Sequence, residues 1–319
     1  MPWDQLLTWT FLISIATAGI RLAVPILLAV LGEIITERSG VMNLGLEGIM
    51  LVGGLAGFTA TFAMEQAALV ALAPWIGLLV GLLAGALMGL LMAVLTVSLR
   101  TDQVVTGVTL VLLGQGLTAF MYRRLFGSVG KRVQGLDTLP IPGLSQVPVV
   151  GDIFFNHNLM VYATALLVAV CWFGLFRTNW GLNLRAVGEN PAAAATSGLN
   201  VVWIRYLCVV GGAALTGLGG AVLTVVQLHL FTEGVTAGRG WIAIALVVFS
   251  RWQPVWAMLG AISFGMVDAL QFRIQTLGSQ EMPYELLLLL PYALALVVLS
   301  LRNQRNAAPN ALGVPYLKS

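Results

Sequence analysis

The stretch LGEIITERSGVMNLGLEGIMLVGG, residues 31–54, is the most informative part of the chain. Only 9% of the 319 residues are charged. Four charged side chains nevertheless fall inside this stretch: Glu33, Glu37, Arg38 and Glu47. Apolar runs flank it on both sides, and charge beside or inside a membrane-spanning segment is costly and usually functional. A short solvated loop is the alternative interpretation. Five glycines between residues 40 and 54 instead favour close helix contact or an interrupted helix at membrane depth.

The composition predicts an all-α polytopic integral membrane protein with a single transmembrane domain over residues 1–319. Hydrophobic residues make up 59% of the chain, whereas a soluble domain is nearer half apolar and a quarter charged. The net charge of +3 suits loops at a membrane surface better than nucleic acid. Cys171 and Cys208 lie in or beside apolar runs and give no disulfide framework. No Lys or Arg precedes the first apolar run, so a cleavable signal is not expected.

Apolar runs of spanning length, about 17 to 25 residues, predict eight or nine transmembrane segments. They cover residues 11–31, 44–62, 75–98, 103–126, 158–176, 203–228, 254–275 and 284–301. A shorter run at 239–250 suits a half-helix or a tilted helix.

Two patterns predict how these segments pack. Glycines recur at every fourth position, 77, 81, 85 and 89, and this spacing predicts a seam where a neighbouring backbone approaches closely. The segments PWIGLLVGLLAG at 74–85 and PVWAMLGAISFG at 254–265 share proline, tryptophan and spaced glycines. Inverted repeats with discontinuous helices are a recurring transporter plan, and these two segments are candidates for such a repeat, running in opposite directions.

Orientation rests on Lys and Arg. Placing the connection at about 177–202 in the cytoplasm puts nine basic residues on that side and six on the other. Four basic residues at 123–132 oppose this orientation. The connection at about 127–157 then lies outside, as a cap where a delivering protein docks or as an idle spacer. Glu33, Glu37 and Arg38 are expected near the cytoplasmic boundary, where they pair or are solvated.

The sequence contains no pattern for an ATPase, a metal site or a hydrolase, and no cofactor is expected. The segment LFGSVGKR at 125–132 comes nearest to a P-loop, but Arg132 stands where Ser or Thr should bind magnesium. The chain has two histidines, neither within a cluster of metal-ligand spacing. No G-x-S-x-G nucleophile elbow is present. An intramembrane hydrolase assembled from distant residues is the remaining enzyme interpretation.

The connection FRTNWGLNLRAVGENPAAAATSGLN, residues 176–200, predicts a short capped helix. Asn190 suits the N-cap, Pro191 the first helical position and Gly198 the C′ position. A helix of about two turns is marginal alone. It therefore requires a partner surface, and its methyl-sized side chains suit insertion into a groove. A capped loop helix without a partner is the alternative.

Four segments resemble one family of membrane proteins. They are ERSGVMNLGLEGIML at 37–51, RAVGENPAAAATSGLNV at 185–201, GRGWIAIALVVFSRWQP at 238–254 and ALGVPY at 311–316. Together they resemble the permease subunits of nucleoside-type ABC importers, which belong to a larger set that also moves ribose, other simple sugars and branched-chain amino acids. The resemblance covers nearly the whole chain, and the first segment is the most telling for the nucleoside branch.

This resemblance implies the ABC importer permease fold in a bacterial cytoplasmic (inner) membrane. It implies a separate ABC ATPase, a second related permease forming a heterodimer, and an extracytoplasmic substrate-binding lipoprotein. In the family, the connection matching 185–201 is the coupling helix that fits a groove on the ATPase. The residues expected to couple are Arg185, Gly188, Glu189, Asn190, Pro191 and Gly198, with Ala194 packing against the ATPase.

The translocation path is expected to use polar side chains able to face a cavity, because a nucleoside needs amide or carboxylate partners. The candidates are Asn43, Glu47, Gln103, Thr106 and Gln227. Interhelical hydrogen bonding is the alternative role for each. Two other transport functions stay open. One is a permease for sugars such as ribose or galactose, and the other is an ion-coupled secondary transporter using Glu47 or Asp268 as a proton site.

Overall fold

The computed structural model of the protein describes residues 8–127, 130–276, 293 and 308–316. The long helices in these ranges are α2 (Trp9–Arg38), α3 (Leu46–Gln66), α4 (Ala73–Ala93), α5 (Gln103–Phe126), α7 (Leu159–Arg177), α10 (Val201–Ala221) and α12 (Pro254–Thr276). The shorter elements are β1 (Thr138–Pro140), α6 (Val150–Phe154), β2 (Asn156–Asn158), α8 (Asn179–Glu189), α9 (Pro191–Thr196) and α11 (Arg239–Ser250). The π-helical turns η1 (Val94–Ser98) and η2 (Val222–Gln227) extend α4 and α10.

The predicted membrane class is confirmed. Seven helices of the described ranges are long and apolar enough to cross a membrane, and α11 is a shorter apolar helix. The first predicted run is one helix of 30 residues with Pro25 inside it. Apart from Ala293, the predicted run at 284–301 lies outside the described residues. The antiparallel pair β1–β2 is a small exception to the all-α prediction.

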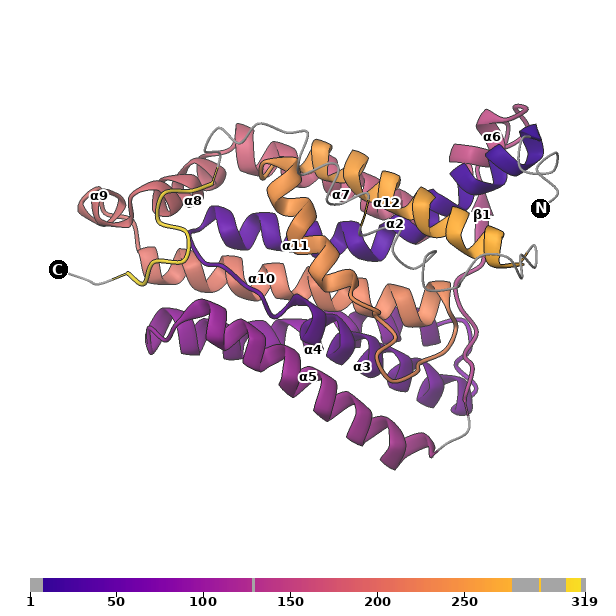
Figure 1. The fold of residues 1–319 in the computed structure, drawn as a ribbon, viewed down its shortest axis with the longest axis horizontal. Helices are drawn as coiled ribbons and strands as arrows, with labels where there is room; N and C mark the ends of the chain where they lie inside the picture. Colours follow the sequence, from indigo (N-terminus) through magenta and orange to yellow (C-terminus); the bar gives the residue numbers. More distant parts are fainter. Residues whose placement is uncertain (1–7, 128–129, 277–292, 294–307, 317–319) are drawn as a thin grey trace.

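The long helices run roughly along one axis, with α10 at the centre (Figure 1). Helix α10 packs against α2, α3 and α4 and is the most buried of the seven candidate spans. Helices α8 and α9 lie at one end, which we call the α9 end, and α6 and β1 lie at the opposite end (Figure 1). The largest apolar cluster joins α2, α11 and α12.

The predicted glycine seam on α4 is confirmed. A Cβ atom added to Gly85 would lie 2.7 Å from the Cα of Gly217, and one added to Gly217 would lie 2.5 Å from the Cα of Gly85. The other three glycines of the seam, at 77, 81 and 89, also lie against atoms of α3 or α10. The backbones of α4 and α10 therefore touch without side chains between them.

Helices α4 and α10 also share a stretch of identical sequence, which lies outside the repeat predicted at 74–85 and 254–265. Both run into a π-helical turn through the same five residues, AVLTV, at 93–97 and 221–225. The two helices are antiparallel, because Gly81 lies against Ala221 whereas Gly89 lies against Ala213. Two copies of one sequence thus end at opposite ends of the molecule, which is the arrangement of an inverted repeat.

The two segments proposed as a repeat from sequence, 74–85 and 254–265, begin α4 and α12. Helix α2 is antiparallel to α10, since Gly32 lies against Gly212 and Gly219 lies against Pro25. It is therefore parallel to α4. Helix α12 starts where α2 ends and returns along it to contact Gly19. These segments accordingly run in opposite directions.

The connection predicted at 127–157 is folded over the end opposite α9 in its described part. Strands β1 and β2 pair here, and the hydroxyl of Thr17 in α2 donates to the carbonyl of Asp152 at 3.0 Å. The amide of Gln134 donates to the Glu65 carboxylate at 2.6 Å, and the amide of Val133 donates to the His229 carbonyl at 3.0 Å. The connection is thus tied to α2, to α3 and to the segment after η2.

Candidate functional site

The stretch at 31–54 is a buried break between α2 and α3. Helix α2 ends at Arg38 and α3 begins at Leu46, with Gly40 in the left-handed region at φ +89°. The free backbone amides of the break are bound by side chains. The amide of Asn43 donates to Glu33 at 2.9 Å, and that of Met42 donates to Gln103 at 2.7 Å. Irregular backbone at membrane depth is tolerated when it is satisfied in this way.

This burial corrects the expectation that Glu33 and Glu37 are solvated. Glu33 is 1% exposed and Glu37 is 3% exposed. The Glu37 carboxylate accepts the indole N–H of Trp252 at 2.5 Å. Pairing within the chain, the other half of the expectation, is what the structure shows.

Glu47 lies in the first turn of α3, and its carboxylate binds the beginning of α11. It accepts the hydroxyl of Thr236 at 2.6 Å, the amide of Gly238 at 2.9 Å and the amide of Gly240 at 2.7 Å. Helix N-termini carry free amides and a partial positive charge, so a carboxylate placed there is stabilising. Glu47 therefore fixes the N-terminus of the short helix α11 against α3.

The other end of α11 is held by the end of α2. The Arg38 guanidinium donates to the carbonyl of Arg251 at 3.4 Å, and Glu37 binds Trp252. Arg251 and Trp252 both have left-handed backbone conformations, with φ of 55° and 57°. Both ends of α11 are thus bound by the α2–α3 stretch. The segments 37–51 and 238–254, which are far apart in the sequence, therefore form one structural unit.

An ion pair also connects α11 to α12. The Arg239 guanidinium lies 3.3 Å from the Asp268 carboxylate, and both side chains are 12% exposed. Asp268 was a candidate proton site in the ion-coupled alternative. In the structure its charge faces a fixed cation.

The structure brings four of the five candidate path residues to the break. Asn43 lies within it, Glu47 lies in the first turn of α3 that follows it, and α5 begins beside it with Gln103. Thr106, one turn further along α5, donates its hydroxyl to the Asp102 carbonyl at 2.7 Å. Gln227 lies elsewhere, since its amide nitrogen donates to the carbonyl of Arg21 in the first half of α2.

The predicted capping of α9 is confirmed. The Asn190 side chain accepts the amide of Ala193 at 3.0 Å, Pro191 takes the first helical position, and Gly198 has φ +88°. The helix itself has six residues, in agreement with the predicted length of about two turns. A second helix, α8, precedes it with Thr178 as its N-cap and was not foreseen.

The remaining coupling candidates divide into buried and exposed groups. Gly188 is buried, and Glu189 and Asn190 are exposed. Arg185 lies over the Phe176 ring at 5.2 Å, and Arg38 lies over the same ring at 5.9 Å. This shared ring links α8 to the end of α2.

The methyl group of Ala194 does not face outward, contrary to the prediction that it packs against the ATPase. The residue is 4% exposed and packs with Val187 and Val201 in a cluster of the chain's own residues, so its methyl group is not offered to a partner. The α9 side chains that face outward are those of Ala192, Ala193 and Thr196. The orientation of a helix this short depends on tertiary contacts that local sequence does not specify.

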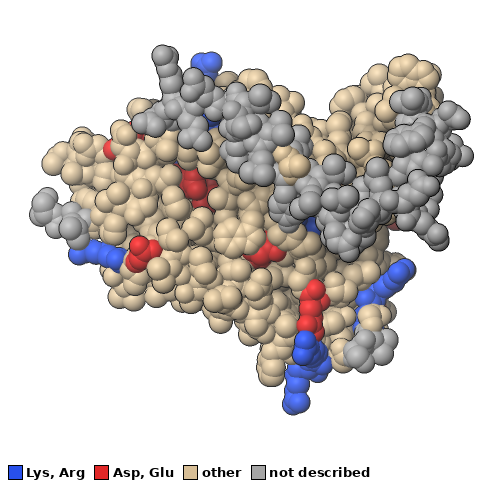
Figure 2. Space-filling model, in the orientation of Figure 1, with Lys and Arg blue, Asp and Glu red and all other residues tan. Residues whose placement is uncertain are grey.

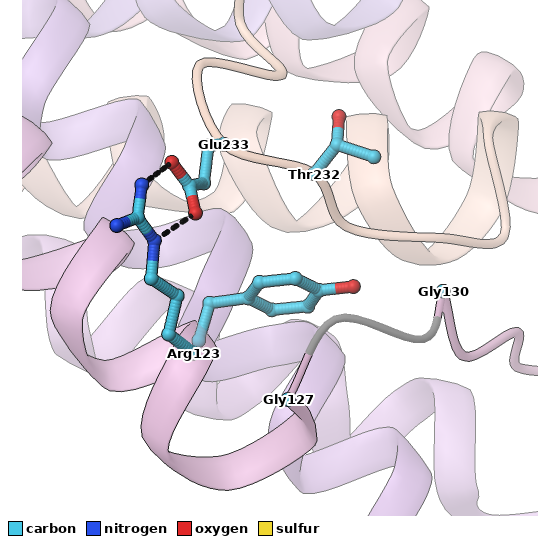
Figure 3. A pocket seen from close by; sticks show the side chains of 6 residues that line it. Arg123, Gly127, Gly130, Thr232 and Glu233 are labelled. Carbon is cyan, nitrogen blue, oxygen red and sulfur yellow. Dashed lines mark hydrogen bonds and ion pairs between the residues drawn. The ribbon is translucent and has the colours of Figure 1, made fainter.

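A cavity of about 600 Å³ lies toward the end opposite α9, by the last turn of α5 (Figure 3). Arg123 and Glu233 point toward each other there and form two hydrogen bonds, of 2.5 and 2.6 Å. Those bonds hold the pKa of the Glu233 carboxyl below its ordinary value. Tyr122 and Thr232 also line the cavity. Sequence analysis missed this pairing because its partners lie 110 residues apart.

Uncharged residues make up most of the described part of the face in Figure 2, with acidic side chains at two places in its middle. Seven apolar spans and a glycine seam between two of them define a polytopic membrane protein. The chain belongs to the family described as branched-chain amino acid transport system / permease component, whose model matches residues 15–299. No solved structure matches the chain.

Three relatives indicate the kind of transport. A putative glucose ABC transporter permease protein of Haloferax volcanii is 42% identical over 84% of this chain and 80% of its own length. The guanosine ABC transporter permease protein of Bacillus subtilis is 38% identical over 95% of this chain and 96% of its own length. The nucleoside ABC transporter permease protein of Lactococcus lactis subsp. cremoris is 36% identical over 92% and 94%.

Family membership and the seven spans establish a multi-pass protein of the cytoplasmic membrane. ABC transporter permeases are transport subunits and not enzymes, and ATP hydrolysis belongs to a separate subunit. An ATPase and a substrate-binding protein are the general partners of such permeases.

Proposed function

We propose that this chain is the permease subunit of an ABC importer that carries nucleosides across the cytoplasmic membrane. One observation carries the proposal. Two relatives that are 38% and 36% identical, and that align over more than nine-tenths of both chains, are named for guanosine and nucleoside transport. The test is uptake of labelled guanosine by cells that express the chain with its neighbouring transporter subunits. Uptake that is lost when this chain is deleted supports the proposal.

A sugar is the second candidate substrate, because the relative named for glucose is 42% identical. Competition separates the two classes. Excess unlabelled purine or pyrimidine nucleoside abolishes guanosine uptake if the proposal holds, whereas ribose, galactose and glucose leave it unchanged. Inhibition by the sugars alone would reassign the permease. Uptake that survives loss of the ATPase and collapses with an uncoupler would support the ion-coupled alternative.

The connection that contains α8 and α9, at about 177–202, is the proposed contact with the ATPase. Its short helix is capped at both ends and turns Ala192, Ala193 and Thr196 outward, while the buried Ala194 anchors it. A flat face of small side chains suits a groove. Deleting residues 190–198 is expected to abolish co-purification with the ATPase, and retention of the complex would contradict the proposal.

A matched pair of single substitutions sharpens this test. Ala193→Glu places a carboxylate on the outward face of α9, whereas Ala67→Glu places one on an exposed alanine after α3. Only Ala193→Glu is expected to release the ATPase. Equal effects of the two substitutions would mean that the loss is not specific to α9.

The break between α2 and α3 is the proposed lining of the translocation path, with Asn43, Glu47, Gln103 and Thr106. It is supported by two side-chain nitrogens without a hydrogen-bond partner in the described part of the chain, Nδ2 of Asn43 and Nε2 of Gln103. Both are buried, and a buried donor left unpaired is costly. Gln103→Leu is expected to raise KM for guanosine and, because the Met42 amide also loses its acceptor, to lower the stability of the chain. An unchanged KM would remove Gln103 from the path.

A second, related permease is the proposed partner on α5. Helix α5 packs mainly on α3, and its other face exposes Thr109 and Gln115 among apolar side chains. Polar groups facing lipid are costly, so a protein partner is a better neighbour than lipid. In Gln115→Cys, the thiol placed on this face of α5 is expected to allow chemical cross-linking to the second permease. Cross-linking between two copies of this chain instead would indicate a homodimer.

A further inference from the structure

Arg205 in α10 is the starting point, because it is a charged side chain with almost no access to solvent. It is 1% exposed, and its Nη1 donates to the carbonyl of Val314 at 3.1 Å. Its Nε and Nη2 have no hydrogen-bond partner within the ranges that the structure describes. A buried charge is expensive unless it is paired or hydrogen-bonded. The single carbonyl from a distant segment is therefore important to this arginine.

That carbonyl belongs to residues 309–316, which we call the 309–316 strap. The strap crosses two other segments at the α9 end of the molecule. The amide of Ala311 donates to the carbonyl of Gly188 at 2.9 Å, and the amide of Gly313 donates to the carbonyl of Gly40 at 3.3 Å. The first bond reaches the end of α8, and the second reaches the break between α2 and α3. Figure 1 shows the strap beside α8 and α10.

Close packing at the same place leaves little room for these segments to slip. A Cβ atom added to Gly40 would lie 2.9 Å from Nη2 of Arg205 and 3.2 Å from the carbonyl oxygen of Ala311. One added to Gly188 would lie 3.3 Å from the amide nitrogen of Gly40. The break, α8, α10 and the strap thus meet at one point around the guanidinium.

The strap also reaches α9. Tyr316 packs against the apolar cluster of Val187, Ala194 and Val201. Ala194 is the one residue of α9 that is buried, so the position of this helix depends on that cluster. A short helix has little stability of its own and takes its position from such contacts.

We propose that the 309–316 strap is part of the coupling apparatus and that Arg205 is its positioning residue. The strap holds α8 and α9 in a fixed relation to the α2–α3 break, so a displacement of α9 moves the break as well. Without it, α9 still binds the ATPase, but only the direct contacts of α8 with Arg38 and Gly40 remain, and less of its movement is passed to the translocation path. This inference rests on the proposed function of α9 as the ATPase contact.

The first test measures transport and ATP hydrolysis together in the assembled transporter reconstituted in vesicles. Arg205→Met removes the donor to Val314, and Ala311→Pro removes the donor to Gly188 from the strap side, away from the membrane interior. Both are expected to keep ATPase binding and hydrolysis while guanosine uptake per ATP falls about tenfold. Arg205→Lys keeps one donor and is expected to recover part of the uptake.

Arg177→Gln is the matched control, because Arg177 lies at the same end but stacks on the Trp172 ring at 5.6 Å. It is expected to leave the ratio of uptake to hydrolysis unchanged. A parallel fall of binding, hydrolysis and uptake in both strap variants would mean that they only destabilise the chain, and would overturn the proposal.

The second test does not depend on the ATPase. Amide hydrogen exchange of the chain alone in lipid nanodiscs is expected to become faster over residues 190–200 in Arg205→Met and Ala311→Pro, and to stay unchanged in Arg177→Gln. If the wild-type chain fails to bind an ATPase while exchange responds in this way, the proposed function fails and the strap still positions α9. Unchanged exchange in both variants would overturn the strap proposal itself.

Discussion

The carboxylate of Glu47 in α3 accepts the backbone amide of Gly240 in α11 at 2.7 Å. This bond joins the break after α2 to the start of a helix almost 200 residues further along the chain. It makes Glu47 a fixed partner of a helix end at membrane depth, where no water replaces it.

Glu47→Ala is expected to lower the free energy of unfolding by about 1–3 kcal/mol for each amide left unpaired and to abolish uptake. Glu47→Gln keeps one carbonyl oxygen as an acceptor and should lose less. Thermal unfolding in detergent and guanosine uptake are the measurements. If Glu47→Ala leaves stability, assembly and uptake intact, both the helix-binding role and the path assignment are wrong.

The glycine seam gives a prediction with a control on the same helix. Gly217→Ala forces a methyl group into the backbone of α4 and is expected to destabilise the protein by about 1–3 kcal/mol. Gly211→Ala meets nothing within 4 Å and should be neutral or stabilising by up to about 1 kcal/mol. Thermal unfolding of both variants measures these changes in stability. Equal changes in the two variants would argue against the seam.

The cap of α9 can be tested against a second asparagine cap. Asn190→Ala removes the bond to Ala193 and should cost about 0.5–2 kcal/mol of local helix stability, lowering the affinity for the ATPase. Asn200→Ala removes the corresponding 3.0 Å bond to Trp203 at the start of α10, and should leave that affinity unchanged. Co-purification at several ATPase concentrations measures the affinity of each variant. A weaker complex with Asn200→Ala alone would contradict the assignment of α9 as the ATPase contact.

The ion pair between α11 and α12 predicts a compensating double substitution. Asp268→Asn leaves the Arg239 charge unpaired and is expected to cost up to about 3–5 kcal/mol. Adding Arg239→Gln removes that charge and should restore part of the stability and uptake. No recovery in the double variant, combined with uptake that is sensitive to an uncoupler, would instead point to Asp268 as a proton site.

His157 in β2 predicts a pH dependence. Burial first, and the nearby charge of Arg21 in addition, lower the pKa of this imidazole, against the opposing effect of its bond to the Ile153 carbonyl. The folded state thus favours neutral His157. Its contribution to stability is complete above the ordinary pKa of about 6.5 and is lost as the pH falls below that value. His157→Gln should reduce the difference in melting temperature between about pH 7.5 and about pH 5.5. An unchanged difference would exclude this residue as its source.

Local patterns predicted the local features well. The four-residue spacing of the glycines predicts a seam because spacing alone puts them on one helix face. Asn190 and Gly198 predict the ends of α9 because capping needs only neighbouring residues. The spans follow from run length for the same reason.

What sequence could not predict was which distant groups meet. Glu47 and Thr236 are 189 positions apart, and Arg205 and Val314 are 109 apart. The burial of Ala194 depends on Val187, Val201 and the rest of its cluster, which only the folded chain assembles. The sequence does single out Arg205 as unusual, however, because it is a charged residue close to the start of an apolar run.

The contact between Gly85 and Gly217 also constrains how this protein can change over generations. Because no side chain separates the two backbones, neither position can gain a methyl group unless the partner helix moves. Glycine has no side chain to lose, so a change at one position cannot make room at the other, and both positions should stay glycine. Chimaeras that take α4 and α10 from different relatives should therefore assemble at this contact when both glycines are kept, and should fail when either is replaced.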